Sequence, residues 1–524
     1  MKYILSAQQM QDSDSFTIES GVPSLELMER AGKACFDIIK SKISKDANII
    51  VIAGSGGNGG DGYVIARYLL ENFYNVKVFS FGTRYKDETK LNKSLYKGEY
   101  LNSLDYLNED NLVIIDALLG VGIEKQLRED YIELIDKINS FKAYVISIDI
   151  NSGVDATKGI SLGAYVKSDL TIAINNYKLG HFFNLGITAY KLLEVVDIGI
   201  HSKSPVNFAK SNDLVDFQWI FSKRNRDTNK GSYGKVALIG GSKLTPGAIN
   251  LSLNALASLR GGVGYALIAI PRSLYTLYAL RNNENIYSTL SDVDGNVVFV
   301  EEEINKLLSY KAIALGMGIG TSKEVYKIIT YLLKNYKGTL LLDADALNSL
   351  SLYGLDILSN HTCDLVLTPH IKEFSRLTSI EISEIKLNYI GYAKEFAKKY
   401  NLIINLKNDV SVITDGNEIF INVNGNAGLA KGGSGDVLSG ITLSLITEKD
   451  RLVERVACGA FILGQAADFA VQDINEYSLL ARDLSTYLIK TFNLLTAKSI
   501  DWIDKKRSFW DDLILQLFSL YKNI

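Results

Sequence analysis

Residues that build metal and redox sites are scarce in this sequence. Its 524 residues include only three cysteines and four histidines. Cys35, Cys363 and Cys458 lie far apart and match no metal-binding spacing, so we expect buried free thiols in a reducing compartment. No two histidines form a close pair, which argues against a zinc site built on histidine.

Signatures of membranes and of P-loop proteins are also missing. No run approaches about eighteen consecutive apolar residues, so we expect no transmembrane helix. The first residues turn polar too early for a secretory signal. The formal net charge of −3 gives no reason to expect nucleic acid or an anionic membrane as a partner. The Gly-x-x-x-x-Gly-Lys-Ser/Thr motif does not occur. We therefore expect a cytoplasmic protein.

Two series of short apolar runs, rich in β-branched residues, alternate with helical segments. This pattern predicts an α/β fold with parallel sheets covered on both faces. The length calls for two cores, and the polar stretch 201–229 fits neither series, so we place a domain boundary between residues 222 and 223. The predicted strands are 48–53, 76–81, 112–116, 144–150, 170–174 and 193–197, then 235–239, 265–270, 312–316, 339–343, 365–368 and 402–406, with helices over 60–71 and after Asp436.

The end of the chain predicts an amphipathic helix. Apolar side chains recur there at three- and four-residue steps between residues 510 and 521. Such a helix either docks on its own domain or contacts a second copy, and we expect a homo-oligomer.

A glycine-rich loop follows the first predicted strand, over residues 54–62. Glycines let the backbone approach a ligand, and the helix start that follows offers free N–H groups to an anion. Gly54, Gly56 and Gly59 satisfy the Gly-x-Gly-x-x-Gly pattern of dinucleotide-binding proteins. The next strand, however, does not end in the acid that holds a ribose, which argues against a nicotinamide dehydrogenase.

Polar side chains at the ends of three further strands meet this loop at one edge of the predicted sheet. They are Asp116, Asp149 with Ser152, and Lys178. Ligands of open α/β sheets bind at this edge. Asn58, Asp116 and Ser152 offer oxygen atoms, which suit a hard cation. Each of these residues taken singly is also typical of a turn cap.

Motifs over residues 1–200 resemble the NAD(P)H-hydrate epimerase domain, which is Rossmann-like. They are Leu27–Gly32, Gly56–Gly62, Asp149–Val154 and Asp197–Gly199. The resemblance implies a potassium ion on Asn58, Asp116 and Ser152. It implies substrate contacts from Asn58, Gly59, Gly60, Asp61, Gly120, Val121, Gly122, Ile123, Glu124, Lys125, Gln126 and Asp149. We predict Asp149 as the catalytic carboxyl group, which would protonate the departing hydroxyl or stabilise the cation left behind.

A second glycine-rich loop, 432–435, precedes Asp436 and an apolar helix. The N–H groups of Gly433, Ser434 and Gly435 form an anion hole suited to a transferring phosphoryl group. Asp436 is placed to take a proton from an attacking hydroxyl, although an acid in a first helical turn is also common for helix stability alone.

Further motifs make the second half resemble the ADP/ATP-dependent NAD(P)H-hydrate dehydratase, a ribokinase-like fold, over about residues 224–487. They are Lys230–Lys235, Gly240–Ser242, Gly316–Gly320, Asp343–Asn348 and Thr368–Glu373. The resemblance implies hydrate contacts from Ala248, Gly318, His370 and Asp436. It implies nucleotide contacts, with Mg²⁺ and ADP or ATP, from Lys407, Asn408, Asp409, Val410, Ser411 and Gly435. His370 is an alternative base, or a hydrogen-bond donor to the substrate.

The chain departs from the epimerase pattern at Gly57 and Asn151. It departs from the dehydratase pattern at Lys372, Asn408 and Leu463. Two other functions stay open beside hydrate repair. The second half alone also fits a small-molecule kinase that releases a stable phosphate ester, and the first half a binding module without catalysis.

Overall fold

Two α/β units make up the chain in this computed structural model, one spanning Lys2–Ala209 and the other Lys210–Ile524. The structure describes residues 3–105, 107, 110–123, 125–201, 209–211, 214–221, 224–253, 260–280 and 285–496. The unit boundary follows Ala209. Residues 222 and 223, on either side of the predicted domain boundary, lie outside the described residues, as does the amphipathic segment 510–521.

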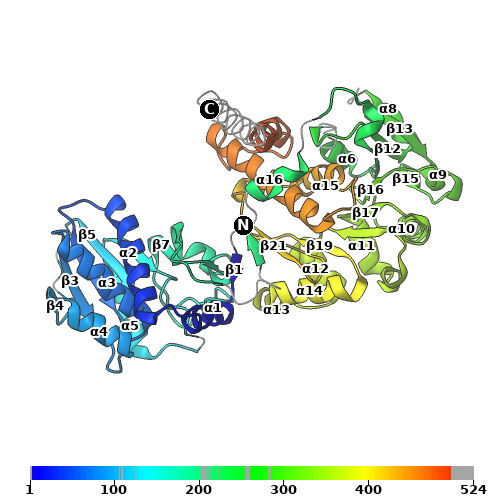
Figure 1. Cartoon of the computed structure of the whole chain (residues 1–524). Helices are drawn as coiled ribbons and strands as arrows, with labels where there is room; N and C mark the ends of the chain where they lie inside the picture. Colours follow the sequence, from blue (N-terminus) through cyan, green and yellow to red (C-terminus); the bar gives the residue numbers. More distant parts are fainter. Residues whose placement is uncertain are drawn as a thin grey trace, which may run out of the picture. The chain divides into compact units, whose positions relative to one another are not determined.

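The N-terminal unit is built on a parallel sheet with the strand order β4-β3-β2-β5-β6-β7-β9 (Figure 1). A short parallel pair, β1 with β8, lies outside this sheet. The strands are β1 (Tyr3–Leu5), β2 (Asn48–Ala53), β3 (Asn75–Ser80), β4 (Glu99–Leu101), β5 (Leu112–Ala117), β6 (Tyr144–Ile148), β7 (Ser168–Ile174), β8 (Tyr177–Lys178) and β9 (Tyr190–Val196). The helices are α1 (Ala7–Glu19), α2 (Ser24–Lys42), α3 (Gly57–Glu71), α4 (Asp87–Leu95) and α5 (Glu129–Ser140).

Alternation along strand β2 sorts its side chains to the two faces of this sheet. Ile49 and Val51 join the core under helices α2 and α3, whereas Ile50 and Ile52 join the core under α5. Because successive side chains of a strand point to opposite faces, an unbroken apolar run is what a sheet covered on both faces requires.

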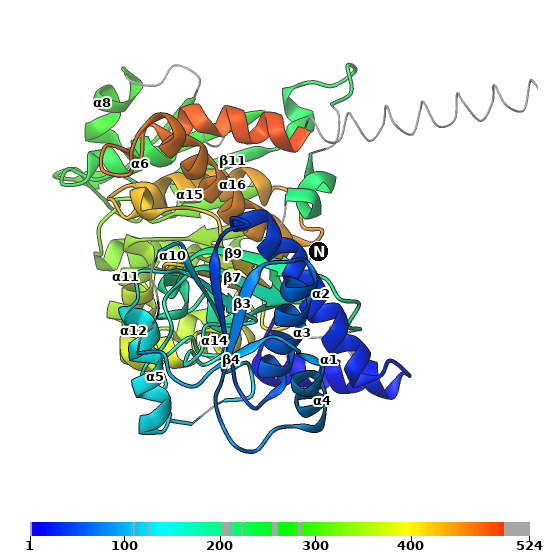
Figure 2. The same cartoon turned by 90° about the vertical axis from the view of Figure 1, so that its left-hand side faces the viewer.

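The C-terminal unit has a longer sheet with the order β13-β12-β11-β16-β17-β18-β19-β20-β21. Figure 1 labels several of these strands, and Figure 2 shows the same unit turned by 90°. It is parallel from β13 to β19 and ends in an antiparallel hairpin. The strands are β11 (Lys235–Ile239), β12 (Tyr265–Pro271), β13 (Ile286–Leu290), β16 (Ala312–Leu315), β17 (Thr339–Leu342), β18 (Asp364–Leu367), β19 (Ile403–Leu406), β20 (Ser411–Thr414) and β21 (Ile419–Asn422). The main helices are α6 (Pro246–Leu253), α10 (Lys323–Asn335), α11 (Asp345–Tyr353), α12 (Ile371–Thr378), α14 (Tyr389–Tyr400), α15 (Ser434–Leu445) and α16 (Leu452–Asp473).

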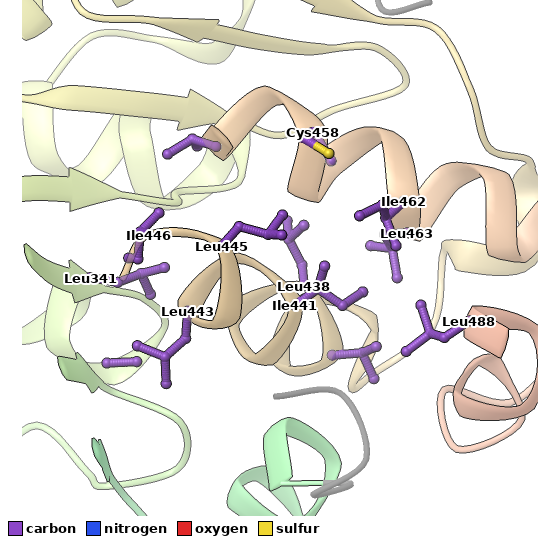
Figure 3. Close-up of a cluster of buried hydrophobic side chains, with 14 of the residues drawn as sticks. Leu341, Leu438, Ile441, Leu443, Leu445, Ile446, Cys458, Ile462, Leu463 and Leu488 are labelled. Atoms are coloured by element: carbon purple, nitrogen blue, oxygen red, sulfur yellow. The ribbon is translucent and has the colours of Figure 1, made fainter. Parts of the chain in front are cut away.

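Helices α15 and α16 bury the largest described cluster of this unit, shown in Figure 3. Leu438 and Ile441 of α15 meet Ile462 and Leu463 of α16. Each such side chain, when fully buried, contributes about 1.5–3 kcal/mol of transfer free energy. The cluster therefore fixes the start of α15, where Asp436 lies. Two α/β units with parallel sheets confirm the predicted fold class.

Candidate active sites

A cavity of about 560 Å³ opens at the carboxyl ends of the strands in the N-terminal unit. Helix α1, the start of α3 and the loop after β5 form its walls. Its polar lining includes Gln11, Asp14, Ser15, Asn58, Asp61, Lys86, Glu88, Asp149 and Lys178. The glycine-rich loop and two of the predicted strand-end groups, Asp149 and Lys178, thus meet where parallel sheets bind ligands.

Asn58 lines the cavity, and only the nitrogen of its side-chain amide makes hydrogen bonds to described residues. Its Nδ2 donates to the carbonyl oxygens of Leu119, at 2.7 Å, and Ile148, at 3.1 Å. Its Oδ1 is buried and has no hydrogen-bond partner among the described residues. A buried oxygen without a donor is costly, and a cation would satisfy it.

Asp116 and Ser152 lie together beneath the cavity, fully buried. The Ser152 hydroxyl donates to Asp116 Oδ1 at 2.5 Å, and Ser147 donates to Oδ2 at 2.8 Å. Burial raises the pKa of Asp116, and the hydrogen bonds from Ser152 oppose that rise. The three predicted ion ligands therefore provide oxygen atoms, but Asp116 and Ser152 are not on the cavity wall.

Asp149 is held in a strained backbone conformation by three neighbours. Its φ is +69°, and strand β6 ends one residue earlier, at Ile148, because a left-handed residue cannot continue the ladder. Its Oδ1 accepts hydrogen bonds from Lys178 Nζ and, at 3.2 Å, from the N–H of Ile174. Its carbonyl oxygen lies 3.0 Å from His181 Nε2. Such strain is typical of functional positions.

His181 completes this support as a neutral ring. Its Nδ1 accepts the N–H of Lys178 at 3.0 Å, so Nε2 carries the proton and donates to Asp149. Burial, reinforced by the charge of Lys178, lowers the pKa of His181 to about 3. Lys178 itself is fully buried and also donates to the carbonyl of Ile174 at 2.8 Å.

Acidic side chains outnumber basic ones in the lining of the cavity. Burial, together with the charge of Asp149, raises the pKa of Asp14 to about 6 and that of Asp61 well above its usual range. Asp61 was predicted as a substrate contact, whereas Asp14 and the role of His181 were missed. The sequence does carry a signal for Asp14. Asp14 lies four residues from Met10 and from Ile18, so the three side chains share one face of the helix, and this acid stands between two apolar residues.

The predicted substrate loop is only partly on the cavity wall. Gly120, Val121, Gly122 and Ile123 line it. Lys125 and Gln126 are exposed and are not part of the lining, and Glu124 lies outside the described residues. Gly59 and Gly60 are buried in the first turn of α3.

Asn151, one of the departures from the family pattern, ties the loop after β6 together by hydrogen bonds. Its Nδ2 lies 2.9–3.0 Å from oxygen atoms of Val166, Ser168 and Ala189. Its Oδ1 accepts from the Thr171 hydroxyl at 2.7 Å. The loop is thus held by a buried hydrogen-bond network.

In the C-terminal unit, Asp436 lies in the first turn of α15, after a glycine turn. Gly433 caps the helix with a φ of +99°, which favours glycine. Burial and the nearby charge of Asp343 raise the pKa of Asp436 to about 7, while Lys407 opposes the rise. A carboxyl group that titrates near neutral pH beside free helix N–H groups is suited to accept a proton from a substrate hydroxyl.

Lys407 and Asp343 form an ion pair next to this turn. Lys407 Nζ lies 3.1 Å from Asp343 Oδ1, and the Ser439 hydroxyl donates to Oδ2 at 2.6 Å. A Cβ atom built on Gly435 would lie 3.3 Å from Lys407 Nζ. The predicted anion hole and the Lys407 ammonium therefore lie side by side. Sequence reasoning missed Asp343 and Ser439, although the Asp343–Asn348 motif had been noted.

His370 caps helix α12 and is oriented by its own helix. Its Nδ1 accepts the N–H groups of Lys372 and Glu373, both at 3.1 Å, so the neutral ring carries its proton on Nε2. Burial and the charge of Lys407 lower the pKa of His370. Burial raises the pKa of Glu373 to about 7. This geometry favours His370 as a hydrogen-bond donor over its use as a base.

Ala248 and Gly318, both predicted to contact the hydrate, lie next to each other. A Cβ atom on Gly318 would lie 2.9 Å from that of Ala248, and the Thr245 hydroxyl donates to the Gly318 carbonyl at 2.9 Å. The same loop reaches Asp345, whose Oδ2 accepts the N–H of Gly320 at 2.8 Å. Asp345 in turn acts electrostatically on Asp436.

The predicted nucleotide loop follows β19 and runs beside His370. Lys407 exchanges backbone hydrogen bonds with Pro369, at 2.8 Å, and Ile371, at 3.1 Å. Asn408 and Asp409 are exposed, Ser411 is partly exposed and Val410 is buried. The departure at Leu463 lies in the apolar core of α16 (Figure 3).

Metal clusters and membrane helices were sought in the described residues. No group of three or more His, Cys, Asp or Glu side chains there is arranged to hold a metal ion. Within the same residues, no helix is long and apolar enough to cross a membrane.

Comparisons with known proteins cover both units. The family described as YjeF-related protein N-terminus matches residues 24–180, and that described as NAD(P)H-hydrate dehydratase matches residues 236–490. The bifunctional NAD(P)H-hydrate repair enzyme Nnr of Dictyoglomus turgidum is 30% identical over 487 residues, covering 89% of this chain and 93% of that one. Its counterpart in Moorella thermoacetica is 29% identical over 511 residues, covering 93% and 96%.

Among solved structures, the ADP/ATP-dependent NAD(P)H-hydrate dehydratase from Bacillus subtilis, co-crystallised with ATP and Mg²⁺, is 27% identical. It covers 54% of this chain and 97% of its own, with a TM-score of 0.47. The relatives match nearly end to end across both units, so the resemblance seen in the motifs is confirmed. The chain belongs to the family of bifunctional NAD(P)H-hydrate repair enzymes.

Proposed function

We propose that this protein repairs hydrated nicotinamide cofactors with two active sites. The N-terminal unit interconverts the (R)- and (S)-hydrates of NADH and NADPH. The C-terminal unit dehydrates the (S)-hydrate at the expense of ADP or ATP. The observation that carries the proposal is Asp436, a partly buried acid with a pKa of about 7 at a glycine-capped helix start, in a chain whose family repairs these hydrates.

Dehydration begins when Asp436 takes the proton of the C6 hydroxyl, whose oxygen attacks the terminal phosphorus of the nucleotide. The N–H groups of Gly433, Ser434 and Gly435 and the Lys407 ammonium face the charge on the transferring phosphoryl group. Lys407, Asn408, Asp409, Val410, Ser411 and Gly435 hold the nucleotide, and Ala248, Gly318, His370 and Asp436 contact the hydrate.

Phosphorylation turns a poor leaving group into a good one. The C6–O bond then breaks, phosphate departs, and the electron pair of the ring nitrogen forms the bond to C6. Loss of a proton from C5 restores the dihydropyridine, with AMP as the second product when ADP is the donor. Neutral His370 donates a hydrogen bond from Nε2 to the substrate.

Mg²⁺ belongs with the nucleotide in this proposal. The described residues provide no carboxylate cage, and Mg²⁺ is commonly held through substrate phosphates and water. When bound, the ion neutralises phosphate charge. The protein's own part is to present the anion hole and Lys407.

Epimerisation needs only that the hydroxyl leave C6 and return on the other face. The ring nitrogen expels it, and the Asp149 carboxylate stabilises the cation. Its Oδ1 already accepts hydrogen bonds from Lys178 Nζ and the Ile174 N–H, and this engaged acceptor suits the role of cation stabiliser better than that of proton donor. Asn58, Asp61 and the loop residues 120–123, which line the cavity, contact the substrate in this proposal.

A potassium ion fits the oxygen atoms at the base of this cavity. Asn58, Asp116 and Ser152 would hold it, and the buried Oδ1 of Asn58 lacks any other partner among the described residues. When bound, the ion would supply a fixed positive charge to this site. Thermal unfolding in K⁺ against choline salts of equal ionic strength tests the site, and the stabilisation should vanish in Asn58→Ala.

Incubation with NADH hydrate and ADP tests the whole proposal. Return of NADH absorbance together with AMP is expected. A stable phosphorylated product would identify a small-molecule kinase instead. In the absence of nucleotide, faster exchange of the (R)- and (S)-hydrates is expected, and its absence would make the N-terminal unit a binding module. We further propose domains 1–222 and 223–524, a homo-oligomer and a cytoplasmic location.

A further inference from the structure

One face of helix α1 presents a single carboxyl group to the cavity of the N-terminal unit. Met10, Asp14 and Ile18 lie at four-residue steps and all line the cavity. Asp12, only two residues away, is exposed and accepts a hydrogen bond from Gln8 at 2.8 Å instead. The helix thus carries one acid on its cavity face and one on its solvent face.

The carboxyl group of Asp14 is partly buried and has no partner that would account for its position. No hydrogen bond or ion pair joins it to another of the described residues. The charged groups that act on it are Asp149, Lys178 and Lys86, and Asp61 and Glu88 share the cavity wall. A partly buried acid among other acids, with the only fully buried ammonium of this wall already paired to Asp149, has a structural cost and needs another reason to be there.

The proposed epimerisation leaves one role unassigned. Hydroxide is a poor leaving group, so an acid must give it a proton as the C6–O bond breaks. Asp149 already uses Oδ1 to accept hydrogen bonds from the Lys178 ammonium and the Ile174 N–H, so the proposal uses this acid to stabilise the cation and not as the proton donor. A second, protonated carboxyl group is therefore required on the cavity wall.

We infer that Asp14 is that second catalytic residue, the acid–base group of the epimerase site. This inference rests on the proposed epimerase function. The Asp14 carboxyl gives its proton to the C6 hydroxyl, the C6–O bond breaks, and the lone pair of the ring nitrogen forms the C6–N double bond as water departs. Water then adds to the opposite face of C6, the electron pair returns to nitrogen, and the proton lost by that water restores the acid form of Asp14.

The environment of Asp14 suits a group that must hold and release a proton at neutral pH. Burial, first, and the Asp149 charge, second, raise its pKa to about 6, while Lys178 and Lys86 oppose them. The work is then divided between two acids whose surroundings differ. Asp149, paired with the Lys178 ammonium, stabilises the cation, and Asp14, without such a partner, exchanges the proton.

The test compares Asp14→Asn with Asp12→Asn in the full-length protein. Both variants make the same change on the same helix, one facing the cavity and one facing solvent. Exchange of (R)- and (S)-NADH hydrate is followed by chromatography without nucleotide, so that dehydration is silent. Asp14→Asn should lose about 100-fold or more of the exchange rate, and Asp12→Asn should match the wild type.

Two further measurements keep the inference falsifiable. The exchange rate of the wild type should fall as pH rises through about 6, because the acid form is lost, and Asp14→Glu should retain this dependence with reduced rate. Wild-type exchange in Asp14→Asn, or a pH profile without an inflection in that range, overturns the role of Asp14. No exchange by the wild type overturns the epimerase proposal itself, which is a different result.

Discussion

Lys407 Nζ and Asp343 Oδ1 form a 3.1 Å ion pair beside the glycine turn that carries Asp436. The two partners act on Asp436 in opposite directions. The Asp343 charge raises the pKa of Asp436 and the Lys407 charge lowers it, while burial makes the larger contribution and brings the value to about 7. The pair thus adjusts the group that the proposed dehydration uses as its base.

Dehydratase activity should therefore fall as the pH drops below neutral. Asp436 accepts a proton only as a carboxylate, so kcat/KM for the (S)-hydrate should fall about tenfold for each pH unit below about 7. Initial rates at saturating nucleotide between pH 5.5 and 9 check this, within the approximate range over which the protein stays folded. A profile that is flat through pH 7 would remove Asp436 as the base.

Replacing Asp343 should lower the pH at which dehydratase activity begins to fall. Asp343→Asn removes a negative charge that raises the pKa of Asp436 and leaves Lys407, which lowers it, without its ion-pair partner. The acidic limb of the pH–rate profile should then move to lower pH, even if the maximal rate falls. Asp356→Asn, an exposed acid on the same unit, is the matched control and should leave the limb unchanged.

Removing the base itself should separate the two activities. Asp436→Asn should lower kcat for dehydration by about 10²–10⁴-fold, the usual worth of a general base. Exchange of the (R)- and (S)-hydrates should remain, because the cavity of the N-terminal unit contains no residue of this loop. Both rates are measured on one preparation, and an equal loss of both would indicate misfolding rather than lost chemistry.

Much of the fold was readable from the sequence because buried parallel strands are local and apolar. The runs 48–53 and 235–239 coincide with β2 and β11. The prediction for 144–150 was wrong at its end, because the left-handed backbone of Asp149 stops the strand at Ile148. Nothing in the local pattern announced that turn. The β20–β21 hairpin was also missed.

The sites were less predictable because distant residues complete them. Glycine loops revealed Asn58 and Asp436, since helix starts are encoded locally. The partners of these residues were not visible: Ser439 reaches Asp343 across 96 residues of chain. Asp14 was hidden because an acid on an amphipathic helix ordinarily faces solvent. Only the fold shows which face of α1 is covered.

The hydrogen-bond network of Asn151 predicts a stability defect rather than a catalytic one. Asn151→Ala would leave the buried Thr171 hydroxyl and the carbonyls of Val166 and Ala189 without this partner. The N-terminal unit should lose about 2–3 kcal/mol of unfolding free energy. Asn75→Ala, at an exposed asparagine, should change it little. Hydrogen exchange of the β6–β7 region, compared between the two variants, measures the difference, and equal protection would mean that the network contributes nothing.

The burial of Asp14 predicts a variant that is more stable and less active. The pKa of Asp14 is about 6 in the folded protein against 3.8 for the free side chain, so the folded state binds its proton more tightly. Between these two values the unfolding free energy falls as pH rises, and above about pH 6 the whole penalty is present. Asp14→Asn removes it, which should stabilise the N-terminal unit at pH 8 by about 2 kcal/mol, with no difference near pH 4.

Tryptophan fluorescence cannot follow this change, because all three tryptophans lie beyond residue 209. Hydrogen exchange of peptides from α2 and β2, at both pH values, reports on the unit directly. Asp12→Asn should show no such gain. If Asp14→Asn were less stable at pH 8, the carboxylate would have to be held by an attraction that its surroundings do not provide. If Asp14→Asn gained stability and lost the interconversion of the (R)- and (S)-hydrates, the acid would be retained for its chemistry at a cost in stability.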